Sequence, residues 1–414
     1  NVLSYFRKLE NYQGKESQYH GSLGNMIVSE LNNNNPSCRA WVEAAKEFGL
    51  PANEDFNGET TYGVGSYQFS STGRMRYSSA TAFLKPAMKR SNLTVKTNAL
   101  VSKVLFNKNK AIGVEWIENN EVKKAYANCE VILSGGSLQS PQILQLSGIG
   151  PAELLKKHDI PIIFDSPEVG QNLQDHYQVR GIVKLKNNNG SVNNQSRNPF
   201  KIAEWGLRWL LFGSGPLTCG AGQVGGAACS KFSKKGRPDL QFNVMPLSVD
   251  KPGEPLHNYP GFTASVWQCH PESRGSLKIK STDPKEQAEI RPEYLSTKLD
   301  QNVIVDGIKM IRSIFNQPSF RDLWEKEMLP GDSVKSDEEI LHWAKHNGGT
   351  VFHAVGTCRM GNDSKSVVDE ELNVRGVENL RVIDASVMPQ VTSANTNAPS
   401  LMIGEKGVSF ITKN

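Results

Sequence analysis

Several features that mark membrane and nucleic-acid-binding proteins are absent from this sequence of 414 residues. No stretch approaches 18 consecutive apolar residues, so the sequence predicts no transmembrane helix. No block of like charges occurs, and 47 basic against 42 acidic residues leave a net charge of only +5. We therefore expect no nucleic-acid partner, while no pattern indicates an oligomeric state.

The six cysteines are scattered, with no CxxC pair and no spacing typical of metal ligands. This pattern favours a reduced protein without a disulfide framework, and it predicts no metal site. A cytoplasmic location is the corresponding expectation. No signal peptide is visible, but the chain opens on Asn1, without an initiator Met, in an amphipathic segment. We expect the start of the protein to be missing.

The length favours two domains, and the composition, with 38% hydrophobic and 21% charged residues, is that of a globular protein. After a polar segment with one predicted helix over residues 38–48, short β-rich runs separated by turns predict a β-meander. The predicted strands of this region are 93–96, 100–106, 111–117 and 121–127.

A buried strand over residues 130–133 runs through Gly135-Gly136-Ser137 into a helix. Ser140 is suited to the N-cap of this helix, and Pro141 to its first turn. A strand that ends in glycines before a helix directs backbone N–H groups toward a bound anion. An ordinary strand-to-helix turn explains the three residues Gly-Gly-Ser equally well.

The region from 177 to 345 alternates strand-like runs with helical ones and predicts an α+β domain. Strands are predicted at 181–185, 240–245, 263–268 and 276–279, and helices at 200–212 and 302–315.

The run Val351 to Met360, VFHAVGTCRM, contains a single histidine, His353, in an apolar setting. A histidine in such a setting is more often a core residue than a catalytic one. Further on, a strand over 380–383 ends at Asp384-Ala385, and the segment Ser393 to Pro399 opens a final helix over 400–412. Asn397 is suited to cap that helix.

Several of these runs together resemble the glucose–methanol–choline (GMC) family of FAD-dependent oxidoreductases, in its choline and alcohol dehydrogenase-like branch. They are GSLQSPQILQLSGIG at 136–150, VGQNLQDH at 169–176, the run around His353, and the segments 379–389 and 393–399. Their number and order make a chance match improbable.

The resemblance implies an α/β (α+β) fold with an FAD-binding domain and a substrate domain whose mainly antiparallel sheet is flanked by helices. The FAD-binding domain would comprise residues 79–175 and 354–414, and the substrate-binding domain residues 1–78 and 176–353. The family's N-terminal GxGxxG unit, which holds the FAD pyrophosphate, does not occur in this sequence. We therefore expect an N-terminally truncated fragment.

The resemblance also implies the cofactor contacts. Val101 would face the adenine through its backbone, Gly136 and Ser137 would follow the strand at the cofactor, Asp384 and Ala385 would lie near the ribityl-pyrophosphate, and Asn397 would lie near the flavin ring. Sheet packing is a competing explanation for Val101 and Ser137.

Alcohol oxidation needs a base near the hydroxyl oxygen and a hydride acceptor at the flavin N5. The resemblance places His353 there as general base or alkoxide partner, and Asn395 at the second catalytic position. An amide can donate a hydrogen bond to an alkoxide but cannot take its proton, so the base is His353.

The resemblance implies Gln223 and Phe352 as substrate-side residues. Choline-specific relatives carry a glutamate where this sequence has neutral Gln223 in the predicted loop 222–226, which favours an uncharged primary alcohol over choline. The resemblance implies O2 or a quinone-type molecule as the electron acceptor. Two alternatives remain: a flavin-containing lyase on the same fold, and an inactive fragment.

Overall fold

The computed structural model describes residues 2–31, 35–188, 190–251 and 253–412, and it divides the chain into two compact units. The first unit is Asn1–Ala87, Tyr177–Cys269 and Lys298–Gly349, and the second is Met88–His176, His270–Thr297 and Thr350–Asn414. These bounds differ from the predicted domains mainly at 270–297. That segment belongs to the second unit because its hairpin bonds there, Leu277 N–H donating to the Gly170 carbonyl at 2.6 Å.

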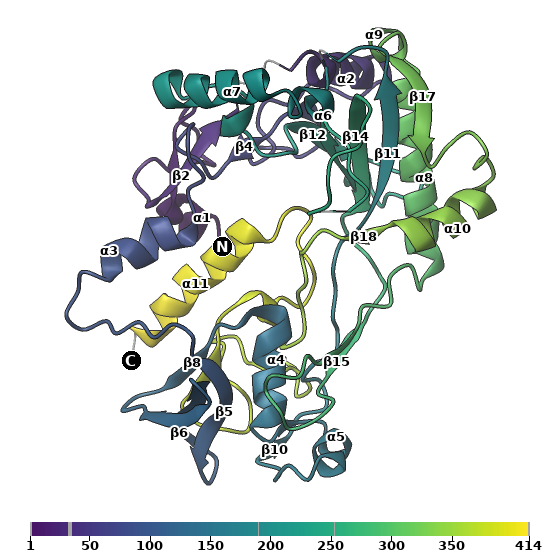
Figure 1. The fold of residues 1–414 in the computed structure, drawn as a ribbon. Helices are drawn as coiled ribbons and strands as arrows, with labels where there is room; N and C mark the ends of the chain where they lie inside the picture. Colours follow the sequence, from purple (N-terminus) through teal and green to yellow (C-terminus); the bar gives the residue numbers. More distant parts are fainter. Residues whose placement is uncertain (1, 32–34, 189, 252, 413–414) are drawn as a thin grey trace. The chain divides into compact units, whose positions relative to one another are not determined.

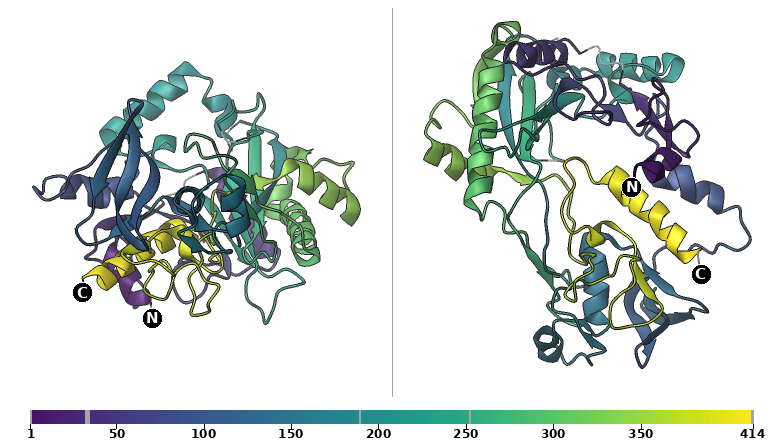
Figure 2. Two further views of the ribbon diagram at one scale, coloured as in Figure 1. Left: turned by 90° about the horizontal axis from the view of Figure 1, so that it is seen from below. Right: turned by 180° about the vertical axis from the view of Figure 1, so that it is seen from behind.

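The first unit is built on an antiparallel sheet in the order β12-β13-β14-β11-β17, with β18 beside β11 (Figure 1). Every residue of β14 is buried, because α8 packs against it and β11. The view from behind in Figure 2 shows α8 lying along this sheet. The strands are Tyr177–Leu185 (β11), Val224–Ala228 (β12), Leu240–Met245 (β13), Gly261–Gln268 (β14), Trp324–Leu329 (β17) and Gly349–Thr350 (β18).

Four of the first unit's helices begin with caps that their sequences supply, and Ser191 caps one of them, α6 (Val192–Gln195). Asn35 caps α2, Asn198 caps α7, and Ser336 and Glu339 form a capping box at α10. The helices are Leu3–Leu9 (α1), Pro36–Glu47 (α2), Ala80–Leu84 (η1), Lys85–Ala87 (α3), Val192–Gln195 (α6), Pro199–Phe212 (α7), Pro216–Thr218 (η2), Lys298–Phe315 (α8), Pro318–Arg321 (α9) and Asp337–Asn347 (α10).

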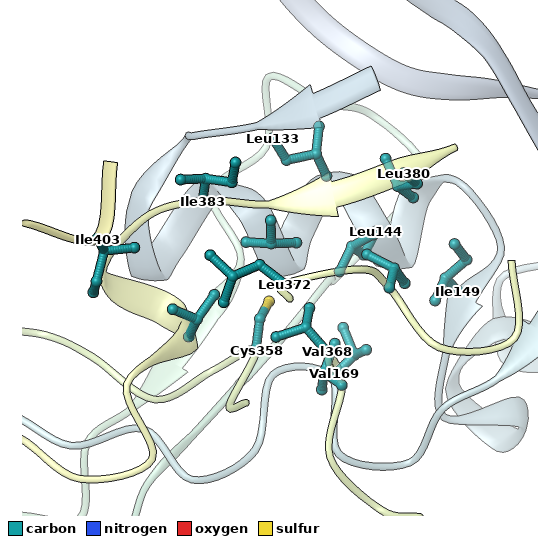
Figure 3. Packing of buried hydrophobic residues seen from close by; sticks show 14 of the residues in the cluster. Leu133, Leu144, Ile149, Val169, Cys358, Val368, Leu372, Leu380, Ile383 and Ile403 are labelled. Carbon is teal, nitrogen blue, oxygen red and sulfur yellow. The ribbon is translucent and has the colours of Figure 1, made fainter. Parts of the chain in front are cut away.

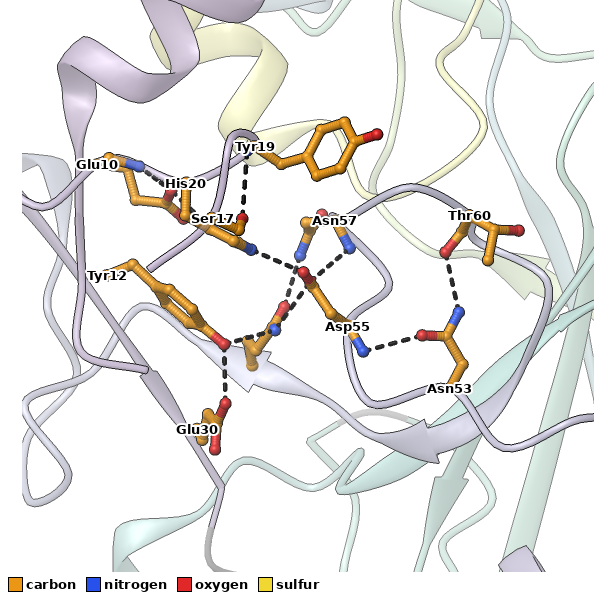
Figure 4. A network of polar contacts seen from close by, with 12 residues as sticks. Glu10, Tyr12, Ser17, Tyr19, His20, Glu30, Asn53, Asp55, Asn57 and Thr60 are labelled. Atoms are coloured by element: carbon orange, nitrogen blue, oxygen red, sulfur yellow. Dashed lines mark hydrogen bonds and ion pairs between the residues drawn. The ribbon is translucent and has the colours of Figure 1, made fainter. Parts of the chain in front are cut away.

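A polar network ties together the N-terminal part of the first unit (Figure 4). The buried His20 lies between Glu10 and Asp55, with its Nδ1 2.9 Å from one carboxylate and its Nε2 3.0 Å from the other. Tyr12 stacks on the His20 ring and donates to Glu30. The short strands here are Glu10–Tyr12 (β1), Met26–Glu30 (β2), Gly63–Ser66 (β3) and Gln68–Phe69 (β4).

The second unit combines a three-stranded meander with a parallel pair of strands, β8 and β19. A buried apolar cluster, with Leu133, Leu144, Cys358 and Val368 among its members, packs around this pair and α4 (Figure 3). The elements are Leu100–Asn107 (β5), Lys110–Glu118 (β6), Glu121–Tyr126 (β7), Val131–Leu133 (β8), Gly136–Leu146 (α4), Ile149–Gly150 (β9), Ala152–Lys157 (α5), Phe164–Asp165 (β10), Ser276–Lys278 (β15), Glu289–Arg291 (β16), Leu380–Val382 (β19), Ala385–Val387 (η3) and Asn397–Ile411 (α11).

The predicted meander is confirmed as β5-β6-β7, but the predicted strand at 93–96 is wrong. That segment has alternating side chains but pairs with no strand, and all its residues are exposed. The predicted loop 222–226 is also wrong in its second half, which is strand β12. A Cβ on Gly226 would lie 2.0 Å from the Gly63 carbonyl oxygen, so the glycine permits a close strand contact there.

Two predicted helix caps are wrong. Helix α4 begins at Gly136, so Ser140 and Pro141 lie inside it. The N-cap position of α11 is Thr396, and Asn397 is already helical. Among the described residues, no helix is both long and apolar enough to cross a membrane.

Candidate active site

The segment that contains the predicted catalytic histidine, His353, pairs with a second, antiparallel segment of the same unit. Gln174 and Val355 exchange two backbone hydrogen bonds, at 3.0 and 2.8 Å, and Val351 N–H donates to the His176 carbonyl at 3.2 Å. This pairing fixes residues 174–176 beside residues 351–355. The run VGQNLQDH and the run around His353 are therefore one structural element.

Asp175 holds the backbone of the His353 segment. One carboxylate oxygen accepts from the His353 N–H at 2.9 Å, and the other accepts from the hydroxyls of Thr350 and Tyr294, each at 2.5 Å. Burial raises the pKa of Asp175, while these donors and the His176 backbone N–H act against that rise. The carboxylate that holds the His353 N–H is thereby itself held by two hydroxyls.

The His353 imidazole makes two side-chain contacts through its two nitrogens. Its Nε2 lies 3.0 Å from the Asn395 side-chain nitrogen, and its Nδ1 lies 2.9 Å from Nδ1 of His176. Burial lowers the pKa of His353 from 6.5 to about 4. The imidazole is therefore neutral at neutral pH. The two residues predicted to be catalytic are direct neighbours.

Phe352 precedes the buried His353 but points the other way. Its side chain is 75% exposed and its φ is +64°, a conformation that aromatic residues rarely adopt. The Phe352 N–H donates to the Thr350 hydroxyl at 2.7 Å, which helps to hold this turn. The assignment of Phe352 to the substrate side stays a prediction.

Four of the predicted cofactor residues meet at the carboxyl ends of β8 and β19. The Gly136 N–H donates to the Asp384 carboxylate at 2.9 Å, and Ser140 Oγ donates to the same oxygen at 2.5 Å. Ser137 joins this edge to the histidine segment, because its hydroxyl donates to the Ala354 carbonyl at 2.6 Å. Ala385 begins the short helix that follows Asp384.

The other predicted site residues lie elsewhere. Val101 is in β5, paired with Trp116 of β6, and Asn397 is exposed in the first turn of α11. Gln223 belongs to the first unit, where its buried side-chain oxygen lies 3.8 Å from the sulfur of Cys38.

Comparison of the sequence with known proteins shows which family the chain belongs to. Two family profiles, both described as GMC oxidoreductase, match residues 1–178 and 271–404. The chain is 39% identical, over its whole length and 75% of the relative, to the alcohol dehydrogenase [acceptor] of Pseudomonas putida. The chain belongs to the GMC oxidoreductase family. It is also 38% identical to human mitochondrial choline dehydrogenase, over 99% of this chain and 69% of the relative.

A solved structure shows the same architecture. An FAD-dependent oxidoreductase from Chaetomium thermophilum matches with a TM-score of 0.90 at 27% identity, covering all of this chain and 80% of that one. The predicted family, mixed α/β fold and enzyme class are confirmed: the chain is a GMC oxidoreductase that acts on CH–OH groups, like alcohol and choline dehydrogenases.

The family binds FAD, and the edge formed by Gly136, Asp384 and Ala385 fits part of that cofactor. An ideal Cβ on Gly136, whose φ is +76°, would meet no atom within 4 Å, so the space before α4 is open. The anion at the Gly136 N–H is the chain's own Asp384 carboxylate, which corrects the expectation of a free N–H for a bound anion. A carboxylate accepts hydrogen bonds from hydroxyls and repels phosphates, so this edge suits the cofactor's sugar-alcohol chain.

Two residues of the site, Tyr294 and Thr350, had no signal in the sequence, and a third, Thr357, stood in a recognised run that did not indicate its partner. Tyr294 and Thr350 reach Asp175 from 119 and 175 residues away, and Thr357 donates to the Ser137 carbonyl at 2.7 Å. Asp175 and His176 stood in a recognised run, but nothing in that run indicated which group they contact.

Proposed function

We propose that the chain oxidises an uncharged primary alcohol to the aldehyde, with His353 taking the hydroxyl proton. The observation that supports this proposal is the contact between Nε2 of a buried, neutral imidazole and the Asn395 amide, 3.0 Å apart. A base and a hydrogen-bond donor side by side are the two groups that alcohol deprotonation requires.

Each residue has a distinct part in this reaction. His353 Nε2 accepts the proton as the O–H bond breaks, and the Asn395 amide donates a hydrogen bond to the oxygen as its negative charge develops. The C–H bond breaks with loss of a hydride, which leaves the aldehyde. Bound FAD supplies the acceptor for the hydride and its two electrons. The electrons then pass to O2 or to a quinone-type molecule.

The preference for an uncharged alcohol rests on the neutral residue Gln223, which the sequence resemblance alone assigns to the substrate side. A trimethylammonium group that leaves water needs a counter-charge or an aromatic face to offset its desolvation. The Gln223 amide is neutral and its side chain is buried. One relative is named for alcohol and another for choline, and the neutral side chain favours the first substrate class.

Anaerobic mixing of the FAD-loaded protein with butanol, benzyl alcohol or choline tests both parts of the proposal. We expect the two neutral alcohols to bleach the visible flavin band faster than choline does. His353→Ala should slow the bleaching by about 10²–10⁴-fold while FAD stays bound. His158→Asn, a change at the end of α5 in the same unit, is the matched control and should leave the rate unchanged.

Three outcomes would contradict the proposal. Unchanged bleaching in His353→Ala would return His353 to a structural role. Faster bleaching by choline than by the neutral alcohols would overturn the substrate class. Cleavage of a hydroxynitrile without any bleaching would indicate a lyase.

A further inference from the structure

His176 is fully buried, and its ring meets the His353 ring edge to face. The two Nδ1 atoms are 2.9 Å apart, the ring planes are at 87°, and the ring centroids are 5.1 Å apart. A contact of this length between two nitrogens is a hydrogen bond only if one nitrogen carries a proton and the other does not. The protonation of the pair is therefore linked.

We propose that His176 is a positioning residue that holds His353 in the tautomer protonated on Nδ1, leaving Nε2 unprotonated toward Asn395. This inference rests on the proposed function, because an unprotonated Nε2 is what a base at that atom needs. The His176 ring contacts Nδ1 of His353, whereas Asn395 contacts Nε2 on the other side of the same imidazole. His176 acts on the reaction only through His353.

The contacts on the two sides of His353 allow one consistent pattern. An amide nitrogen can only donate, so the Asn395 side chain makes Nε2 of His353 the acceptor. A neutral imidazole has one proton, which must then be on Nδ1 and be donated to His176. Nδ1 of His176 is therefore an acceptor, and the His176 proton is on its Nε2.

The backbone of both histidines is held by hydrogen bonds, which fixes the main chain from which the two rings project. The His353 N–H is held by Asp175, and the His176 carbonyl accepts from Val351 at 3.2 Å. The Asp175 carboxylate lies beside this pair, where it accepts from the His353 backbone N–H and from the hydroxyls of Thr350 and Tyr294. Burial, which keeps His353 neutral, supports the one-proton pattern.

Nitrogen NMR of the protein labelled with ¹⁵N-histidine reads the tautomer directly, without any turnover. We expect the wild-type His353 ring to be protonated on Nδ1 and bare on Nε2. His176→Asn keeps an acceptor oxygen near the Nδ1 position and should retain this tautomer. His176→Leu removes the acceptor and should move the His353 proton toward Nε2.

Flavin reduction by a neutral alcohol gives the second readout. His176→Leu should lower kcat by about 10²-fold or more, as expected for a base held in the wrong tautomer, with KM changed less than about threefold. His176→Asn should recover most of the rate, and His158→Asn is again the control. If His176→Leu does not fold, the test rests on two other results: the tautomer in the wild-type spectrum, and the tautomer and rate of His176→Asn.

Two results would overturn the inference. One is a wild-type His353 protonated on Nε2, and the other is unchanged kcat in His176→Leu. Failure of the proposed function looks different, because it appears as unchanged flavin reduction in His353→Ala, whatever tautomer the spectrum shows.

Discussion

At the scale of single residues, the Asp175 side chain links more segments of the site than the proposed reacting residues, His353 and Asn395, do through the contacts described above. Its carboxylate accepts from one backbone N–H and two hydroxyls contributed by segments 119 to 178 residues away. All these contacts lie in the second unit. A buried acceptor that serves several donors is costly to remove, because each donor loses its partner at once.

Asp175→Asn tests this role. The change replaces one acceptor oxygen by an N–H donor that faces other donors, so we expect a loss of about 1–3 kcal/mol in the free energy of unfolding. Urea unfolding measures it. Tyr294→Phe, which removes only one of the donors, is the comparison and should cost less. Equal costs for the two variants would contradict the view that Asp175 organises the whole group.

At the scale of elements, helix α4 contains a proline, Pro141, five residues after its first residue, Gly136. Pro141 has no N–H to give to the Ser137 carbonyl, its normal helical partner four residues earlier. The Thr357 hydroxyl donates to that carbonyl instead, at 2.7 Å. Thr357 lies four residues after His353, so the same contact ties α4 to the catalytic segment.

Thr357→Val keeps the shape of the side chain but removes this donor. We expect the unfolding free energy to fall by about 1–3 kcal/mol, because a buried carbonyl is left without a partner. Pro141→Ala restores an N–H at position 141, so it should recover part of the loss in the Thr357→Val background. A urea unfolding cycle of the four proteins gives the coupling between the two sites. Additive effects would show that the two groups do not share the Ser137 carbonyl.

The same helix shows where sequence reasoning fails. Strand β8, the glycine turn and the presence of α4 were predictable from local pattern. The helix start was not, because the Asp384 carboxylate that binds the Gly136 N–H and the Ser140 hydroxyl is 248 and 244 residues away from them. The strand predicted at 93–96 fails for a related reason: alternation describes a strand's faces but does not supply a partner strand.

The candidate site likewise contains residues that the sequence predicts and residues that it does not. His353 and Asn395 were predictable only through the family's runs, and the structure brings their side chains to 3.0 Å. The roles of the other predicted residues stay predictions. Tyr294 and Thr350 could not be predicted, because single hydroxyls outside any recognised run carry no pattern. Thr357 stands in a recognised run, but nothing in that run indicates its contact with the Ser137 carbonyl.

At the scale of the whole molecule, the two units contain buried histidines whose pKa values move in opposite directions. In the first unit burial alone would lower the pKa of His20, but Glu10 and Asp55 on either side raise it above 6.5. In the second unit burial lowers the pKa of His353 to about 4. The two units should therefore respond differently to pH.

The signs follow from which state binds the proton more tightly. Folded His20 holds its proton better than the unfolded chain does, so its stabilisation is complete below pH 6.5 and is lost as the pH rises through the raised pKa. Folded His353 holds its proton less well. Its contribution is complete above pH 6.5 and is lost as the pH falls toward about 4, a change of about 3 kcal/mol for that pKa difference.

Amide hydrogen exchange, corrected for the intrinsic effect of pH, can follow each unit separately in the full chain. Between pH 6.5 and 4.5 we expect peptides from β8 and β19 to lose protection, and His353→Gln should remove much of that loss. Above pH 6.5, peptides from β1 and β2 should lose protection as the pH rises, and His20→Gln should flatten that dependence. Each variant is the control for the other, because the two histidines lie in different units. If His353→Gln left the acid loss in β8 and β19 as steep as in the wild type, the burial of His353 would not be its source.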